Sequence, residues 1–243
     1  MGPSFNEQFD QHGAWRRAFA QQLKQLAEWM SNHDLMDAAV QERLQRLEGQ
    51  VRTDKVMVAF VAEFSRGKSE LINAIFFADY GRRIMPASAG RTTMCPTELG
   101  YDSTLPPSLR LLPIETRLQM QGLADWRLKP ERWVEIALDV NNADQIAKAL
   151  EKVSEIRRVS IEDARALGFW HDDLTDENPV PDVDGLVEVP MWRHALINIP
   201  HPLLKQGLVI LDTPGLNAVG AEPELTVNRI PQAYAVVFIL SAD

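Results

Sequence analysis

The chain has 243 residues, enough for one large domain or for a domain with a helical appendage. Its net charge of −9 argues against nucleic acid as a partner, because binding a polyanion needs a basic surface. A lone cysteine, Cys95, excludes an internal disulfide, and the sequence shows neither a secretory leader nor an apolar run long enough to span a bilayer. We therefore expect a cytoplasmic protein.

Residues 14–48 carry apolar side chains at spacings of three and four, which predicts helix. The pattern breaks near residues 31–34, so we expect a hairpin of two helices, with Gly49 as the C-terminal stop. The polar face lacks the basic bias that anionic lipid would favour. We therefore favour a hairpin that packs on protein over one that lies on a membrane, and assign residues 1–50 to an N-terminal helical segment.

A phosphate-binding signature occupies Val56–Phe77. An apolar run leads into AEFSRGKS (residues 62–69), and an amphipathic helical pattern follows it. This is the order strand, phosphate loop, helix, with the motif A-x4-G-K-S in which Ala62 stands where glycine is usual. Inward-facing backbone N–H groups and a helix N-terminus would hold a triphosphate. The predicted nucleotide-binding residues here are Glu63, Phe64, Ser65, Arg66, Gly67, Lys68, Ser69 and Glu70.

Each motif residue has a separate expected role. Gly67 lets the backbone approach a phosphate without a Cβ in the way. The Lys68 ammonium would reach the β- and γ-phosphates, and the Ser69 hydroxyl would ligate Mg²⁺.

The next stretch, residues 84–99, contains small residues, Gly90 and two prolines, which predicts a loop that a ligand could order. Beyond it, residues 99–207 predict an insertion with elements of its own. We expect strands at 109–112 and 133–138, and a helix capped by Asn141 or Asn142 with Ile146, Leu150, Val153 and Ile156 on one face. The acidic residues 172–184 lack the ligand spacing of a calcium site and predict a solvated loop.

The C-terminal part predicts strands at 187–199 and 208–211, separated by a bend at 200–202, then a short helix at 222–232 and a fully buried strand at 235–240. Asp212 begins D-T-P-G directly after the second strand. A carboxylate at a buried strand end can hold Mg²⁺, usually through water, and the Gly215 N–H could meet the γ-phosphate.

The alternation of apolar strands with helices predicts an α/β fold of the P-loop NTPase, GTPase type: a mostly parallel sheet flanked by helices, spanning residues 51–243. Ligands of such sheets bind at the carboxyl ends of the strands, where both motifs fall.

Three stretches together resemble the dynamin-like large GTPases, in particular their bacterial members: AEFSRGKSELINAIF (62–76), RTTMCPTEL (91–99) and LVILDTPGLN (208–217). The resemblance implies Mg²⁺-dependent hydrolysis of GTP to GDP and phosphate, with GTP as ligand and substrate. It also implies self-association through the nucleotide face, a helical stalk formed partly by the N-terminal segment, and membrane association or remodelling by the full-length parent, peripheral to the inner membrane. Thr93, or its neighbour Thr92, matches the threonine that completes the Mg²⁺ ligands, giving Ser69, Thr93 and Asp212 as the metal set.

The sequence departs from the family pattern at three places. Leu216 stands where small GTPases carry a water-orienting glutamine, and Phe64 stands where dynamins hold a polar residue instead. Ser65 and Arg66 remain as candidates for stabilising transition-state charge, beside Lys68 and Thr93. The guanine-reading motif [TN]-K-x-D is absent, so we interpret the chain as a truncated GTPase domain whose last strand forms an exposed apolar edge.

Two functions follow. The first is GTP hydrolysis. The second is a nucleotide-binding or interaction fragment without effective turnover, which the truncation and Phe64 favour. The choice between GTP and ATP stays open because the base-reading motif is missing.

Overall fold

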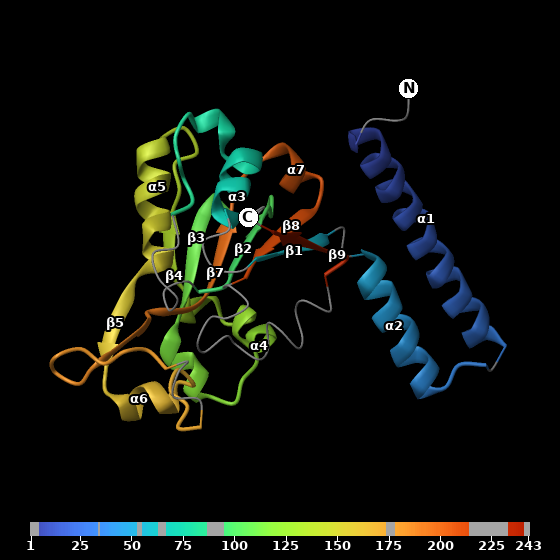
Figure 1. Cartoon of the computed structure of the whole chain (residues 1–243). Coiled ribbons are helices and arrows are strands. Elements are labelled where there is room, and N and C mark those ends of the chain that lie inside the picture. The colour runs from blue at the N-terminus through green and yellow to red at the C-terminus, as the bar shows by residue number, and fades with distance from the viewer. Residues whose placement is uncertain are drawn as a thin grey trace. The chain divides into compact units, whose positions relative to one another are not determined.

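The structure is a computed structural model that describes residues 5–33, 35–52, 55–62, 67–86, 95–173, 178–213 and 233–240. It divides into two compact units, Met1–Lys55 and Val56–Asp243 (Figure 1).

The first unit is a helical hairpin. Helix α1 (Phe5–Asn32) and helix α2 (Ala38–Arg52) contact each other, as the apolar spacing predicts. The break falls where it was expected, but the predicted stop at Gly49 is wrong, because α2 runs through it to Arg52. A glycine inside a helix costs only about 1 kcal/mol relative to alanine, so it does not by itself end a helix. Trp15 and Trp29 on α1 are 58% and 51% exposed.

The second unit is built on a sheet that has seven strands among the described residues, in the order β4-β3-β7-β2-β8-β1-β9. Strands β8, β1 and β9 are parallel, as are β2 and β7, whereas β2–β8, β3–β7 and β3–β4 are antiparallel. The strands are β1 (Val56–Ala62), β2 (Thr97–Gly100), β3 (Ser108–Pro113), β4 (Val134–Ala137), β7 (Trp192–Asn198), β8 (Leu208–Asp212) and β9 (Ala235–Ile239). The predicted fold class, an α/β P-loop GTPase-type sheet flanked by helices, is confirmed. The sheet was expected to be mostly parallel, and among the described strands it has three parallel and three antiparallel pairs.

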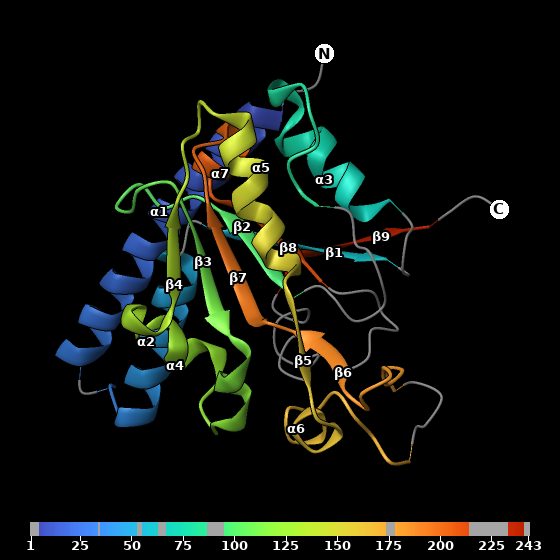
Figure 2. The ribbon, with the colours of Figure 1, turned by 90° about the vertical axis from the view of Figure 1, so that its left-hand side faces the viewer.

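Helices cover both faces of this sheet. On one face α3 (Lys68–Phe76), α5 (Ala143–Glu151) and α7 (Pro202–Lys205) bury Ile72, Leu150 and Leu204 in the main core. On the other face α4 (Leu123–Arg127) packs Trp126 against Leu112 of β3. Short 3-10 helices complete the unit: η1 (Ala78–Tyr80), η2 (Ile114–Leu118), η3 (Pro130–Arg132) and η4 (Lys152–Ser154). Figure 2 shows α3 and α5 alongside the strands.

A small second sheet corrects two predictions. Strand β5 (Ile156–Val159) pairs antiparallel with β6 (Val187–Pro190), and α6 (Ile161–Ala166) lies with them at one end of the main sheet (Figures 1 and 2). The predicted helical position of Ile156 is therefore wrong, since α5 and η4 end before it. The predicted single strand 187–199 is divided at Met191, because its two halves pair in different sheets.

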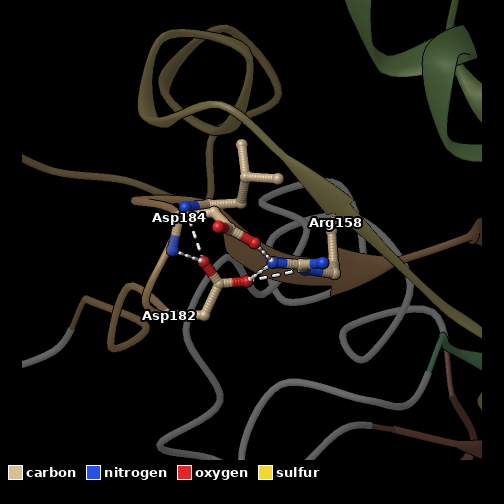
Figure 3. A network of polar contacts seen from close by, with 4 residues as sticks. Arg158, Asp182 and Asp184 are labelled. Carbon is tan, nitrogen blue, oxygen red and sulfur yellow. Dashed lines mark hydrogen bonds and ion pairs between the residues drawn. The ribbon is translucent and has the colours of Figure 1, made fainter.

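In the acidic loop, the turn that lies directly before β6 is bound by Arg158. Arg158 of β5 donates from Nε to Asp182 Oδ2 (2.6 Å) and from a terminal nitrogen to Asp184 Oδ2 (2.7 Å), as Figure 3 shows. Asp182 Oδ1 also accepts the N–H groups of Asp184 and Leu186. The carboxylate oxygens of Asp182 and Asp184 thus accept hydrogen bonds within a turn. This agrees with the prediction of a solvated loop.

Asn142, rather than Asn141, caps α5: its side chain accepts the Gln145 N–H at 3.0 Å. We expect Asn142→Ala to lower the free energy of unfolding by about 1 kcal/mol, since an orphan first-turn N–H loses its acceptor. Asn141→Ala is the matched control and should change it by less than about 0.5 kcal/mol. Urea denaturation of the three proteins measures this, and equal losses from both variants would contradict the assignment.

Strand β9 contradicts the prediction of a fully buried strand. It pairs only with β1 among the described strands and lies at the edge of the sheet, with Phe238 63% and Val236 37% exposed. A continuous apolar run predicts burial on both faces, but it does not say how many neighbours the strand has. The predicted exposed apolar edge is present. Strand β2 begins at Thr97, inside the predicted loop 84–99, and the predicted helix at 222–232 lies outside the described residues.

Candidate nucleotide site

The strand and the helix on either side of the phosphate-binding loop form as the sequence predicts. Strand β1 ends at Ala62, and α3 begins at Lys68 with Gly67 as its N-cap. Gly67 has a φ of +83°, which L side chains rarely adopt, and open space lies where a Cβ would stand. The first-turn N–H groups of a helix have no acceptor within the helix itself, so this terminus suits an anion.

Lys68 and Asp212 meet at this helix terminus. The Lys68 Nζ lies 2.9 Å from Asp212 Oδ1, within ion-pair distance, and the two side chains are 10% and 3% exposed. Sheet register explains the contact, since Asp212 is paired with Phe60, two residues before β1 ends. The two motifs lie some 140 residues apart in sequence, and parallel pairing of β1 with β8 brings them together.

The Asp212 carboxylate is buried with unused acceptor capacity. Neither oxygen accepts a hydrogen bond of good geometry from the described residues, so we treat the Lys68 contact as electrostatic. Burial raises the pKa of Asp212, and the Lys68 ammonium opposes that rise. A buried carboxylate with free lone pairs is a group that a cation or a water ligand would satisfy.

Two further contacts join the site to its surroundings. Thr97, the first residue of β2, is paired with Asp212, so the C-terminal end of the predicted threonine loop lies at the site. The Thr213 hydroxyl donates to the Phe60 carbonyl oxygen at 2.9 Å and fastens the end of β8 to β1. Thr213 was not singled out from the sequence, although its place in D-T-P-G was the available signal.

The predicted site residues divide by position. Gly67, Lys68, Ser69 and Asp212 are brought together, with Ser69 buried in the first turn of α3. Glu70 lies one residue further along α3 and forms an ion pair with Arg83. The other predicted residues lie outside the described ones: Glu63, Phe64, Ser65, Arg66, Thr92, Thr93, Gly215 and Leu216.

A magnesium ion fits the residues that are present. Mg²⁺ is commonly held by one or two carboxylates together with water and substrate phosphates, not by a cage of protein ligands. The described residues contain no cluster of three His, Cys, Asp or Glu side chains that could hold a metal. They do offer the under-bonded Asp212 carboxylate beside the helix turn that carries Ser69. This donor set suits a metal that arrives with a triphosphate.

These features define a P-loop nucleotide-binding domain of GTPase type. The dynamin family model matches residues 58–243, so the chain belongs to the dynamin family, whose conserved N-terminal domain is a GTPase. No curated protein matches the chain.

Two solved structures are similar to the chain, both reported for an oligomerised bacterial dynamin pair with a mechanism for the long-range sensing and tethering of membranes. One is 21% identical with a TM-score of 0.39 over 83% of this chain, and the other is 14% identical with a TM-score of 0.41 over 95%. The chain spans 23% and 27% of their lengths. None of the described helices combines the length and the apolar character that crossing a bilayer requires.

Proposed function

We propose that this chain binds GTP with Mg²⁺ and hydrolyses it to GDP and phosphate. The observation that carries the proposal is the buried Lys68–Asp212 pair, 2.9 Å apart, at the N-terminus of α3. A cation that faces the phosphates and a carboxylate on the metal side are the two charges that phosphoryl transfer requires. Membership of the dynamin family supports GTP as the substrate.

Each residue of the site would have a separate role in binding and hydrolysis. The Gly67 backbone and the α3 terminus would bind phosphate oxygens, and Lys68 would neutralise charge on the β- and γ-phosphates. Ser69, Asp212 and Thr93 would hold Mg²⁺, which when bound supplies Lewis-acid stabilisation of the phosphate oxygens. Thr213 keeps the start of the D-T-P-G loop beside β1, where the Gly215 N–H could meet the γ-phosphate. Ser65 and Arg66 remain our candidates for stabilising the leaving oxygens.

Lys68 would exchange partners when nucleotide binds. Its ammonium now contacts Asp212, and its long stem lets it turn toward phosphates while Asp212 faces the metal. Both charges then keep a partner of opposite sign, which avoids an unpaired charge in a buried site.

The wider role is also a proposal. We assign residues 1–50 to a stalk-like helical segment and residues 51–243 to the GTPase domain. In the intact protein we propose that hydrolysis drives self-association through the nucleotide face, with peripheral association to a membrane from the cytoplasm. The family match over residues 58–243 supports the GTPase-domain assignment. The exposed aromatic side chains of α1 are a surface that further stalk helices would cover.

Titration with a fluorescent GTP analogue, together with an assay of phosphate release, tests the activity. We expect saturable, Mg²⁺-dependent binding, release of phosphate, and displacement of the label by unlabelled GTP at lower concentration than by ATP. Binding without release would favour the alternative, a nucleotide-binding fragment without turnover. Absence of binding would contradict both functions.

A further inference from the structure

Asn73, a buried asparagine on α3, forms a bridge between two parts of the chain. Its Nδ2 donates to the carbonyl oxygens of Ser69 (2.9 Å) and Met85 (3.0 Å). Its Oδ1 accepts the N–H groups of Ile84 (2.9 Å) and Met85 (2.7 Å). Asn73 is only 8% exposed. Its side chain uses both amide hydrogens and both oxygen lone pairs.

The two ends of this bridge have different places in the site. Ser69 lies in the first turn of α3, next to Lys68. Ile84 and Met85 form the stem from which the predicted threonine loop departs, and both are at most 2% exposed. One helical turn from Asn73, Glu70 of α3 also forms an ion pair with Arg83. The stem is therefore fastened to the phosphate-loop helix by hydrogen bonds inside the core and by a charge pair at the surface.

The chemistry requires an asparagine at this position. An aspartate would keep the size and the acceptors but turn an oxygen toward the carbonyl oxygens of Ser69 and Met85. An aliphatic side chain would leave two buried N–H groups and two carbonyl groups without this partner. Four satisfied bonds between a helix turn and a loop stem hold the stem in one position relative to that turn.

We propose that Asn73 is a positioning residue for phosphoryl transfer. It holds the Ser69 turn and the Ile84–Met85 stem as one rigid piece, so that the Ser69 hydroxyl, which we propose ligates Mg²⁺, keeps its position. This inference rests on the proposed GTP hydrolysis.

Asn198 provides a matched control. It is 7% exposed, and it accepts from the Asp102 N–H (2.7 Å) and donates to the carbonyl oxygens of Asp102, Leu105 and Pro106. It also ties a loop to a regular element with four bonds. It ends β7, and its sheet partners are Gly100 and Ser108, so it is remote from the Asp212 end of β8. A merely structural role for Asn73 would make both asparagines respond alike.

The kinetic test compares Asn73→Asp with Asn198→Asp in the full chain. For Asn73→Asp we expect kcat to fall about 10- to 100-fold and the Mg²⁺ requirement to rise, with GTP affinity changed less than about threefold. For Asn198→Asp we expect the melting temperature to fall by about as much as in Asn73→Asp. Its kcat and its Mg²⁺ requirement should stay unchanged. If Asn73→Asp does not fold, Asn73→Ser, which keeps one donor and one acceptor, is measured in the same way.

Hydrogen exchange at the Ile84 and Met85 amides supplies the second readout. In the natural chain we expect GTP with Mg²⁺ to slow exchange at both amides, and in Asn73→Asp we expect that response to disappear. If Asn73→Asp has the same kcat as Asn198→Asp and still shows slowed exchange with GTP and Mg²⁺, the inference is wrong. The proposed function would still stand in that case. A natural chain that neither binds nor hydrolyses GTP would overturn the proposed function, and the inference with it.

Discussion

Replacing Lys68 with alanine is expected to lower GTP turnover by about 100-fold or more, because it removes a preorganised cation from a buried phosphate site. GTP affinity should fall as well, since the ammonium faces charge in both the ground state and the transition state. Phosphate release and nucleotide titration measure the two effects. Lys148→Ala, on the exposed face of α5, is the control and should leave both unchanged.

The same substitution also tests the ion pair. Without Lys68, the Asp212 carboxylate keeps no cation partner among the described residues, so its pKa should rise further. We expect Lys68→Ala to lower the free energy of unfolding at pH 7 by about 3 kcal/mol, and the loss to shrink as the pH falls and Asp212 takes a proton. In an Asp212→Asn background the loss should be much smaller. Equal losses in both backgrounds would show that the two side chains do not interact.

Replacing Asp212 with asparagine should have the second large effect, and its two consequences have opposite signs. Turnover is expected to fall by about 100-fold, because the carboxylate proposed to hold Mg²⁺ loses its charge. The free energy of unfolding at pH 7 is expected to rise. Burial raises the pKa of Asp212 despite Lys68, so the ionised carboxylate costs the folded state more than a neutral amide would. Lys68 is the more exposed partner and has a stem long enough to reach water.

The difference in unfolding free energy between the natural chain and Asp212→Asn should depend on pH, because the pKa of Asp212 is raised. The pKa of Asp212 is higher in the folded chain than in the unfolded chain. Its protonation therefore stabilises the fold fully below the unfolded pKa of about 4, and the stabilisation is lost as the pH rises through the folded pKa. The natural chain should approach the stability of Asp212→Asn as the pH falls from 7 toward 4. Urea midpoints at several pH values measure this, and a gap that widened on acidification would contradict the shift.

Local sequence was sufficient where a motif and its supporting elements are contiguous. The run Val56–Ala62 and the helix from Lys68 to Phe76 were both predicted, because a phosphate loop is specified by the strand and helix on either side of it. Asp212 was assigned correctly to the end of a buried strand for the same reason. The sequence left two candidates for the cap of α5, Asn141 and Asn142, and the structure assigns the cap to Asn142.

Pairing between distant strands could not be predicted from such patterns. The run Val187–Ile199 predicts a single strand, yet it is divided at Met191 because β6 pairs with β5 and β7 pairs in the main sheet. The strand Ala235–Ile239 has a composition typical of burial, yet it has one described neighbour and lies at an edge. Side-chain type predicts whether a segment extends, whereas the number of its partners is a property of the whole sheet.

The sequence by itself determined the chemical class of this protein, because the spacing of glycine, lysine and serine between a strand and a helix specifies a phosphate site through bonds that are local. The tertiary structure alone decided which charges face one another and which distant backbone groups share hydrogen bonds. Lys68 meets Asp212 because β1 and β8 pair in one register, and Asn73 joins Ser69 to Met85 because the chain returns across α3. Such contacts depend on where distant segments pack, and they are also the contacts on which the proposed catalysis depends.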